Sequence, residues 1–95
     1  MKLRPVLVLT DPIGTVPELL VAYISSVMPA VQLPSDVVLD PLHPEHASSG
    51  LKTKSVLRLH KLATIHQRSL VRRLGTVGSR VSTRVAMELR TLLRL

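Results

Sequence analysis

The sequence predicts an α+β fold, with a small, strongly bent antiparallel sheet first and helices at the end of the chain. Short aliphatic runs separated by turn residues occupy residues 5–65. After residue 66 the hydrophobic period changes from two to about 3.6 residues. The order is strands followed by helices, without the alternation that forms parallel sheets. The 95 residues have the length of one domain, and residues 1–95 are treated as a single unit.

The first two strands are predicted on either side of a turn. Residues 5–10 (PVLVLT) are aliphatic and β-branched, and Pro5 stands at the first position, where its missing N–H does least harm to a sheet. Residues 11–14 (DPIG) combine turn-forming aspartate, proline and glycine. Residues 18–26 (ELLVAYISS) form the second strand. In an antiparallel pair, the start of the first strand then lies beside the end of the second.

The third and fourth predicted strands are separated by a long loop. Residues 36–39 (DVVL) form the short third strand. Residues 40–50 (DPLHPEHASSG) contain two prolines, two serines and a glycine, which predicts a loop. Residues 55–65 (SVLRLHKLATI) alternate between apolar and polar side chains, as in a half-exposed strand. The alternation slips near Lys61 and Leu62, which indicates a β-bulge.

Two helices are predicted after the strands. In residues 66–74 (HQRSLVRRL) two leucines stand four apart, and Gly75 follows as a helix C-terminus. Residues 80–93 form a longer amphipathic helix, with its N-cap at Gly78 or Ser79. The apolar stripe of this helix consists of Val81, Val85, Leu89 and Leu92.

The chain is strongly basic, and its charge is unevenly placed. It has 13 Lys and Arg against 6 Asp and Glu, a formal net charge of +7. Residues 51–95 contain eleven of the basic residues, and Glu88 is their one acidic residue. Such a field favours a polyanionic partner, which is nucleic acid, an acidic protein segment or an anionic membrane. The alternative is an ordinary solvated surface.

Several classes of site have little support in the sequence. The absence of cysteine excludes disulfides and thiolate metal sites. His43 and His46 have an HxxH spacing, but neighbouring prolines make a helical pair of metal ligands implausible, so we predict no metal and no cofactor. Gly75 and Gly78 do not follow a strand in the spacing of a phosphate-binding loop, so a nucleotide-binding fold is not indicated.

The apolar segments are too short for a membrane or secretory role. The N-terminal run ends at Asp11 after about five residues, whereas a secretory core needs ~7–15. No stretch reaches the ~20 apolar residues that span a bilayer. We therefore predict a cytoplasmic protein without membrane contact. Tyr23 is the single aromatic residue, so binding of RNA would depend on phosphate charge and weaken with salt.

The candidate site lies at the rim of the predicted sheet. Arg4 precedes the first strand, while Ser25 and Ser26 end the second, so the antiparallel rule brings these residues together. Periodicity alone gives them no function, since an edge arginine is usually solvated and serines commonly end strands. Lys52 and Lys54 follow Gly50 and add basic groups to the next loop.

The order of five segments resembles the PemK/MazF family of toxins from bacterial toxin–antitoxin pairs. These segments are RPVLVLT, VAYISS, QLPSDVVL, SGLKTKSVL and LATIHQRSLVRRLG, followed by the terminal amphipathic helix. The resemblance implies an SH3-like small antiparallel barrel with attached helices, usually a homodimer. It also implies sequence-specific, metal-independent cleavage of single-stranded RNA to a cyclic phosphate and a 5′-hydroxyl.

The resemblance assigns roles to the candidate residues. Arg4 falls on the catalytic arginine of the family and Ser25 on its catalytic threonine. Ser26, Lys52 and Lys54 are candidate nucleic-acid contacts. The implied partners are single-stranded RNA, an acidic antitoxin protein, operator DNA bound together with the antitoxin, and a second copy of the chain.

The sequence departs from the family pattern in ways that leave alternatives open. The strand and long loop that members carry before the Arg-Pro pair are missing here, and His66 stands where an acidic residue is common. The first strand of the barrel is therefore expected to be missing. One alternative is a truncated, non-catalytic relative that binds nucleic acid or an antitoxin. Another is a basic structural protein with accidental similarity.

Overall fold

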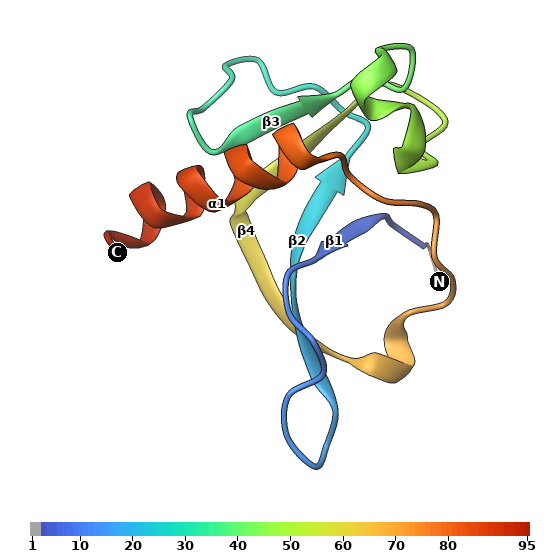
Figure 1. Ribbon diagram of the computed structural model, residues 1–95, viewed down its shortest axis with the longest axis vertical. Coiled ribbons are helices and arrows are strands. Elements are labelled where there is room, and N and C mark those ends of the chain that lie inside the picture. Colours follow the sequence, from blue (N-terminus) through green and yellow to red (C-terminus); the bar gives the residue numbers. More distant parts are fainter. Residues whose placement is uncertain (1–2) are drawn as a thin grey trace.

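A computed structural model describes residues 3–95 and shows a strongly curled antiparallel sheet with one long helix (Figure 1). The sheet order is β1-β2-β4-β3. This arrangement confirms the predicted α+β class, with its bent antiparallel sheet and C-terminal helix. The elements are β1 (Val6–Val8), β2 (Glu18–Ser25), β3 (Asp36–Leu39), the 3-10 turn η1 (Pro44–Ser49), β4 (Ser55–His66), the 3-10 turn η2 (Gln67–Ser69) and α1 (Ser79–Leu93).

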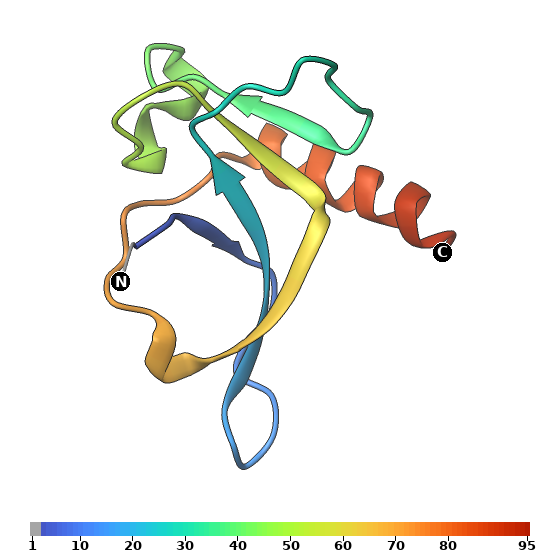
Figure 2. The ribbon, with the colours of Figure 1, turned by 180° about the vertical axis from the view of Figure 1, so that it is seen from behind.

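The curl of the sheet arises where the register between its two long strands shifts. Ala22 pairs with Leu62, whereas the next residue, Tyr23, pairs with Arg58, so residues 59–61 of β4 are extra. Extra residues on one strand bend it and increase its twist. Figures 1 and 2 show β2 and β4 curving together from the top of the molecule to the hairpin below. The predicted bulge near Lys61 is thereby confirmed.

The core is aliphatic and lies between the upper part of the sheet and α1. Val81 and Val85 are one helical turn apart and are buried against β2, β3 and β4. Leu89 is packed against this cluster, but Leu92 is 40% exposed, so the predicted stripe leaves the core at its last member. The sheet residues of the core are Ala22, Ile24, Val37, Leu39, Leu57 and Leu59.

The predicted helix over residues 66–74 is wrong. Only Gln67–Ser69 form a short 3-10 turn, and residues 70–78 have no regular secondary structure. Tertiary contacts explain the difference, because residues 74–76 pack backbone against backbone on residues 48–50.

The contact between these two segments, which we call the glycine clasp, consists of Ser48–Gly50 and Leu74–Thr76. A Cβ at Gly75 would collide with the carbonyl oxygen of Ser48, and one at Gly50 would collide with that of Leu74. The Thr76 N–H donates to the Ser48 carbonyl (2.9 Å), and the Ser48 hydroxyl donates to the Thr76 carbonyl (3.1 Å). Only glycine permits such close approach of two backbones.

Several boundaries differ from the prediction. The first strand is shortened to Val6–Val8, the second ends one residue earlier at Ser25, and the predicted loop contains η1. The N-cap of α1 is Gly78, without a side-chain hydrogen bond. Among residues 3–95, no helix combines the length and the apolar character that a membrane crossing requires.

Candidate functional site

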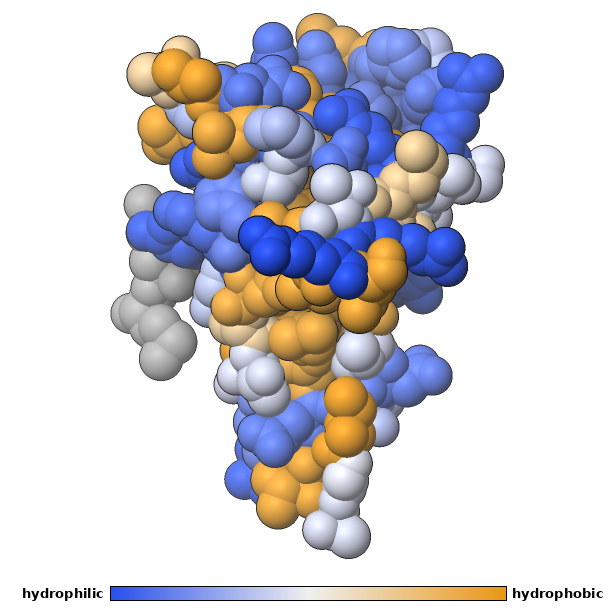
Figure 3. Space-filling view, turned by 90° about the vertical axis from the view of Figure 1, so that its left-hand side faces the viewer, coloured by the Kyte–Doolittle hydropathy of each residue, from blue (hydrophilic) through white to orange (hydrophobic). Residues whose placement is uncertain are grey.

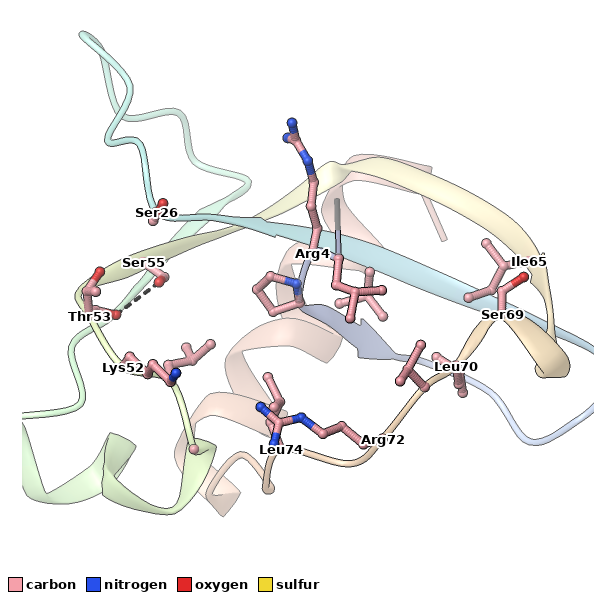
Figure 4. Close-up of a pocket in the computed structure, with 16 residues that line it drawn as sticks. Arg4, Ser26, Lys52, Thr53, Ser55, Ile65, Ser69, Leu70, Arg72 and Leu74 are labelled. Carbon is pink, nitrogen blue, oxygen red and sulfur yellow. Dashed lines mark hydrogen bonds between the residues drawn. The ribbon is translucent and has the colours of Figure 1, made fainter. Parts of the chain in front are cut away.

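The main cavity lies inside the ring that the curled sheet forms with the following loop. Its volume is about 440 Å³, and it is lined by the residues before β1, the loop that follows η1 and residues 69–74 (Figure 4). Its walls are largely apolar, with hydroxyl and cationic groups among them. The apolar side chains include Leu51, Ile65, Leu70 and Leu74.

The strand register places Arg4 beside the end of β2. Val6 pairs with Tyr23, and the Ile24 N–H donates to the Pro5 carbonyl at 3.2 Å. Continuing this register by two residues sets Arg4 across from Ser25. The predicted side-by-side arrangement of the first strand's start and the second strand's end is therefore confirmed.

The predicted site residues are only partly brought together. Arg4, Ser26 and Lys52 line the cavity, whereas Ser25 and Lys54 are absent from its lining. The Arg4 side chain is exposed, and Figure 4 shows its guanidinium directed away from Lys52. Ser25 is half-buried, and its Oγ accepts a hydrogen bond from the Val27 N–H (3.1 Å) and lies 3.5 Å from the Val27 carbonyl.

The cavity is electropositive. Its lining contains the basic residues Arg4, Lys52 and Arg72 and no Asp or Glu. Within residues 3–95 none of these three side chains forms an ion pair or a hydrogen bond. An anion entering the cavity therefore meets cations that no carboxylate neutralises.

Two of the hydroxyl groups at the cavity already have partners. The buried Ser55 donates to the Thr53 carbonyl at 3.0 Å (Figure 4), and Thr53 donates to the Lys54 carbonyl at 3.1 Å. These bonds shape the loop that carries Lys52. Their oxygens still have lone pairs, but their protons are committed.

Arg72 is a cavity residue that was not among the predicted site residues. The predicted helix over residues 66–74 was based on the spacing of Leu70 and Leu74. In the structure these two leucines are 36% and 42% exposed and line the cavity together with Arg72. Only the tertiary contact at the glycine clasp determines this path, and no local sequence signal indicates it.

A second polar cluster lies away from the cavity, where β3 meets β4. The buried Asp36 carboxylate accepts hydrogen bonds from Arg58 Nε (Oδ1, 2.9 Å) and from the Leu33 N–H (Oδ2, 2.9 Å). Burial raises the pKa of Asp36, but the Leu33 N–H and the Arg58 guanidinium lower it, and the net pKa is lowered. His60 Nδ1 is 2.8 Å from the Ser35 hydroxyl. The hydrogen bonds of this cluster hold the turn before β3 in place, so we assign the cluster a structural role and not a catalytic one.

The histidine pair at η1 is also a structural element. Potential ligand atoms of His43, Glu45 and His46 lie within 4.8 Å of one another. However, His43 Nδ1 accepts the Glu45 N–H (3.2 Å) and His46 Nδ1 accepts the Asp40 N–H (3.0 Å). A neutral imidazole that accepts at Nδ1 carries its proton on Nε2, so neither nitrogen offers a free lone pair. Glu45 is paired with Arg80 at 2.9 Å.

The structure combines a small curled sheet, a C-terminal helix and an electropositive cavity beside Arg4. Known proteins were compared with this sequence and this fold. Over residues 1–93 the sequence matches the family described as PemK-like, MazF-like toxin of type II toxin-antitoxin system. The chain belongs to this family, which confirms the resemblance and excludes accidental similarity.

Solved structures agree with this assignment. The fold is similar to that of the Mycobacterium tuberculosis toxin MazF-mt6, with a TM-score of 0.76 and 26% identity over 97% of this chain and 87% of that one. It is also similar to a structure described as an Mtb toxin, with a TM-score of 0.72 and 26% identity over 93% and 90% of the two chains. A comparison with curated protein sequences gives no match.

Proposed function

We propose that the protein is the toxin of a toxin–antitoxin pair and acts as a metal-independent endoribonuclease. Its substrate is single-stranded RNA such as mRNA, cleaved at specific sequences to a cyclic phosphate and a 5′-hydroxyl. The supporting observation is the cavity that Arg4, Ser26 and Lys52 line without any acidic side chain. Membership of a toxin family supports RNA as the substrate of this cationic site.

The proposed reaction needs one well-placed cation rather than a metal. The 2′-oxygen of the RNA forms a bond to the adjacent phosphorus, the bond from phosphorus to the 5′-oxygen breaks, and a proton passes from the 2′-hydroxyl to solvent while the 5′-oxygen takes one up. Negative charge accumulates on the non-bridging oxygens in the transition state. The Arg4 guanidinium stabilises this charge with paired N–H donors.

Ser25 has the role of orienting the phosphate. Its Oγ is held by the Val27 N–H, and its own proton has only the long 3.5 Å contact to the Val27 carbonyl. A phosphate oxygen placed between Arg4 and Ser25 would accept this proton in a stronger bond, because the acceptor is charged. Ser26 and Lys52 contact the RNA within the cavity, and Lys54 contacts it outside.

The catalytic role of Arg4 is tested by cleavage of mixed-sequence RNA in EDTA. Arg4→Ala should lower the cleavage rate at least about a hundredfold, the typical cost of removing one group that stabilises transition-state charge. Arg90→Ala is the matched control, since Arg90 is exposed in the last turn of α1 and does not line the cavity. Equal cleavage by wild type and Arg4→Ala contradicts the proposal.

A second candidate function is binding without catalysis. It is favoured by Arg4 pointing away from the other cavity cations and by Ser25 standing outside the cavity lining. In this case the chain binds nucleic acid or an acidic antitoxin through residues 51–95. Salt-dependent binding without RNA cleavage selects this alternative. With either function, the proposed partners include an acidic antitoxin, operator DNA together with it, and a second copy of the chain in the cytoplasm.

A further inference from the structure

We propose that Lys52 and Arg72 form a second phosphate site, which holds an RNA backbone phosphate next to the one at Arg4. This inference rests on the proposed function and extends it, because it assigns a positioning role to Arg72. The geometry, the electrostatics and the anchoring of the two segments support it in turn.

The two side chains face each other across the same cavity. Lys52 and Arg72 both line it, although they are 20 residues apart in the sequence. Figure 4 shows the ammonium of Lys52 and the guanidinium of Arg72 directed toward one another, while the Arg4 guanidinium points to the opposite side. The cavity therefore has cations at two separate places on its rim.

Electrostatics make the pair suited to an anion. Two cations that face each other repel, and this repulsion is relieved when an anion lies between them. The ion pairs found in residues 3–95 join Arg58 and His60 to Asp36, and Arg80 to Glu45, so they use other cations. A phosphate is a suitable occupant, because arginine offers paired donors to its oxygens and lysine adds a point charge.

The backbone holds both segments in place. The glycine clasp lies directly before the loop of Lys52 and begins two residues after Arg72, and it includes the 2.9 Å hydrogen bond from Thr76 to Ser48. Lys52 and Arg72 are thus two residues from clasp positions Gly50 and Leu74. Holding the segments together before binding reduces the entropy that ordering them would otherwise cost.

The apolar part of the cavity wall suits the sugar and base of a nucleotide. Leu51, Ile65 and Leu70 provide apolar surface, and the lining has no acidic side chain that would repel the phosphates. A sugar and its base have apolar faces and can lie against this wall. Among polyanions, RNA therefore fits the cavity better than an acidic peptide, because every side chain of such a peptide ends in a carboxylate and offers little apolar surface.

The test uses a fluorescein-labelled 2′-deoxy oligonucleotide of mixed sequence, which lacks the attacking 2′-hydroxyl and so reports binding alone. Anisotropy titrations are made over a series of KCl concentrations for the wild type, Lys52→Gln, Arg72→Gln and the double variant. Each single variant should weaken binding about fivefold at low salt and reduce the slope of log K against log salt by about 0.7. Arg90→Gln is the matched control.

The double variant separates a shared site from two independent charges. If both side chains hold one phosphate, the double variant binds only slightly more weakly than either single variant. The inference is overturned if the salt slopes of the Lys52 and Arg72 variants equal that of Arg90→Gln. It is also overturned if the losses of binding free energy in the two single variants add up fully in the double variant. The inference is also overturned if a polyglutamate peptide, rather than the oligonucleotide, shows the dependence on Lys52 and Arg72.

Failure of the proposed nuclease function can be distinguished from failure of the phosphate site. Cleavage of the corresponding RNA by the wild type tests the nuclease activity, whereas the deoxy oligonucleotide tests the phosphate site. In an active enzyme, Arg72→Gln should raise KM with little change in kcat, because a positioning contact is made equally in the bound and transition states. A large fall in kcat with unchanged KM contradicts the positioning role.

Discussion

At the scale of single residues, Asp36 shows how a buried charge depends on its neighbours. Its carboxylate is fully buried and bonded to Arg58 and the Leu33 N–H. Its pKa is lowered in the fold, so the folded state binds the proton less readily than the unfolded state does. The stabilisation is complete above the unfolded pKa of about 3.9 and is lost as pH falls through the lower folded value. Asp36→Asn should cost about 3 kcal/mol at neutral pH, because Arg58 loses its charged partner.

The measurement is urea unfolding at several pH values between 2.5 and 7. The wild type should lose stability below about pH 4, whereas Asp36→Asn should show a weaker dependence there. Asp11→Asn is the control, since Asp11 is exposed in the turn after β1 and surface changes cost within about 0.5 kcal/mol. Equal stability of the two variants at pH 7 would show that the Asp36–Arg58 pair does not stabilise the fold.

At the scale of elements, the glycine clasp determines the path of the chain between β4 and α1. Gly75→Ala places a methyl group against the Ser48 carbonyl, so the two segments must separate. We expect a loss of about 1–3 kcal/mol, the usual cost of overpacking. Thermal unfolding measures the loss, and oligonucleotide binding should weaken together with it, because Lys52 and Arg72 move apart.

Gly78→Ala is the control variant. Its Cβ would be 3.4 Å from the Glu45 carbonyl, so this substitution should cost less stability than Gly75→Ala. Similar losses for both variants contradict the role of the clasp.

The same segment shows the limit of local sequence patterns. The strands over 18–26, 36–39 and 55–65 and the final helix were predictable, because apolar runs between turn residues indicate the strands and a stripe with a period of about 3.6 residues indicates the helix. The bulge in β4 was visible as a slip in alternation near Lys61. Residues 66–74 also have a helical spacing, but the clasp determines their path and leaves Leu70 and Leu74 at a cavity. The helical spacing therefore gave no indication that Arg72 lies at this cavity.

At the scale of the whole molecule, the adjacency of Arg4 and the end of β2 followed from the antiparallel rule, whereas the cavity itself did not. The cavity exists because β2 and β4 curl until residues 69–74 face the start of β1, and the slip in alternation near Lys61 indicates a bend but not its size. The SH3-like closure and the roles of Arg4, Ser25, Ser26, Lys52 and Lys54 remain predictions. The cleavage and binding experiments address the residues' roles directly.

The surface of the whole molecule bears on the proposed homodimer. Figure 3 shows apolar side chains from the C-terminal end of α1 down to the hairpin between β1 and β2, where Ile13 and Val16 are 58% and 60% exposed. The core contains only aliphatic residues, and a domain of this size has a small stability margin.

If folding is coupled to dimer formation, the midpoint of thermal unfolding should rise with protein concentration. Each tenfold increase then stabilises the dimer by about 1.4 kcal/mol. Sedimentation at the same concentrations gives the mass, and a constant midpoint over a hundredfold range with a monomeric mass contradicts the dimer. The concentration series is measured without the deoxy oligonucleotide. A ligand that binds the folded protein would raise the midpoint of thermal unfolding of a monomer as well.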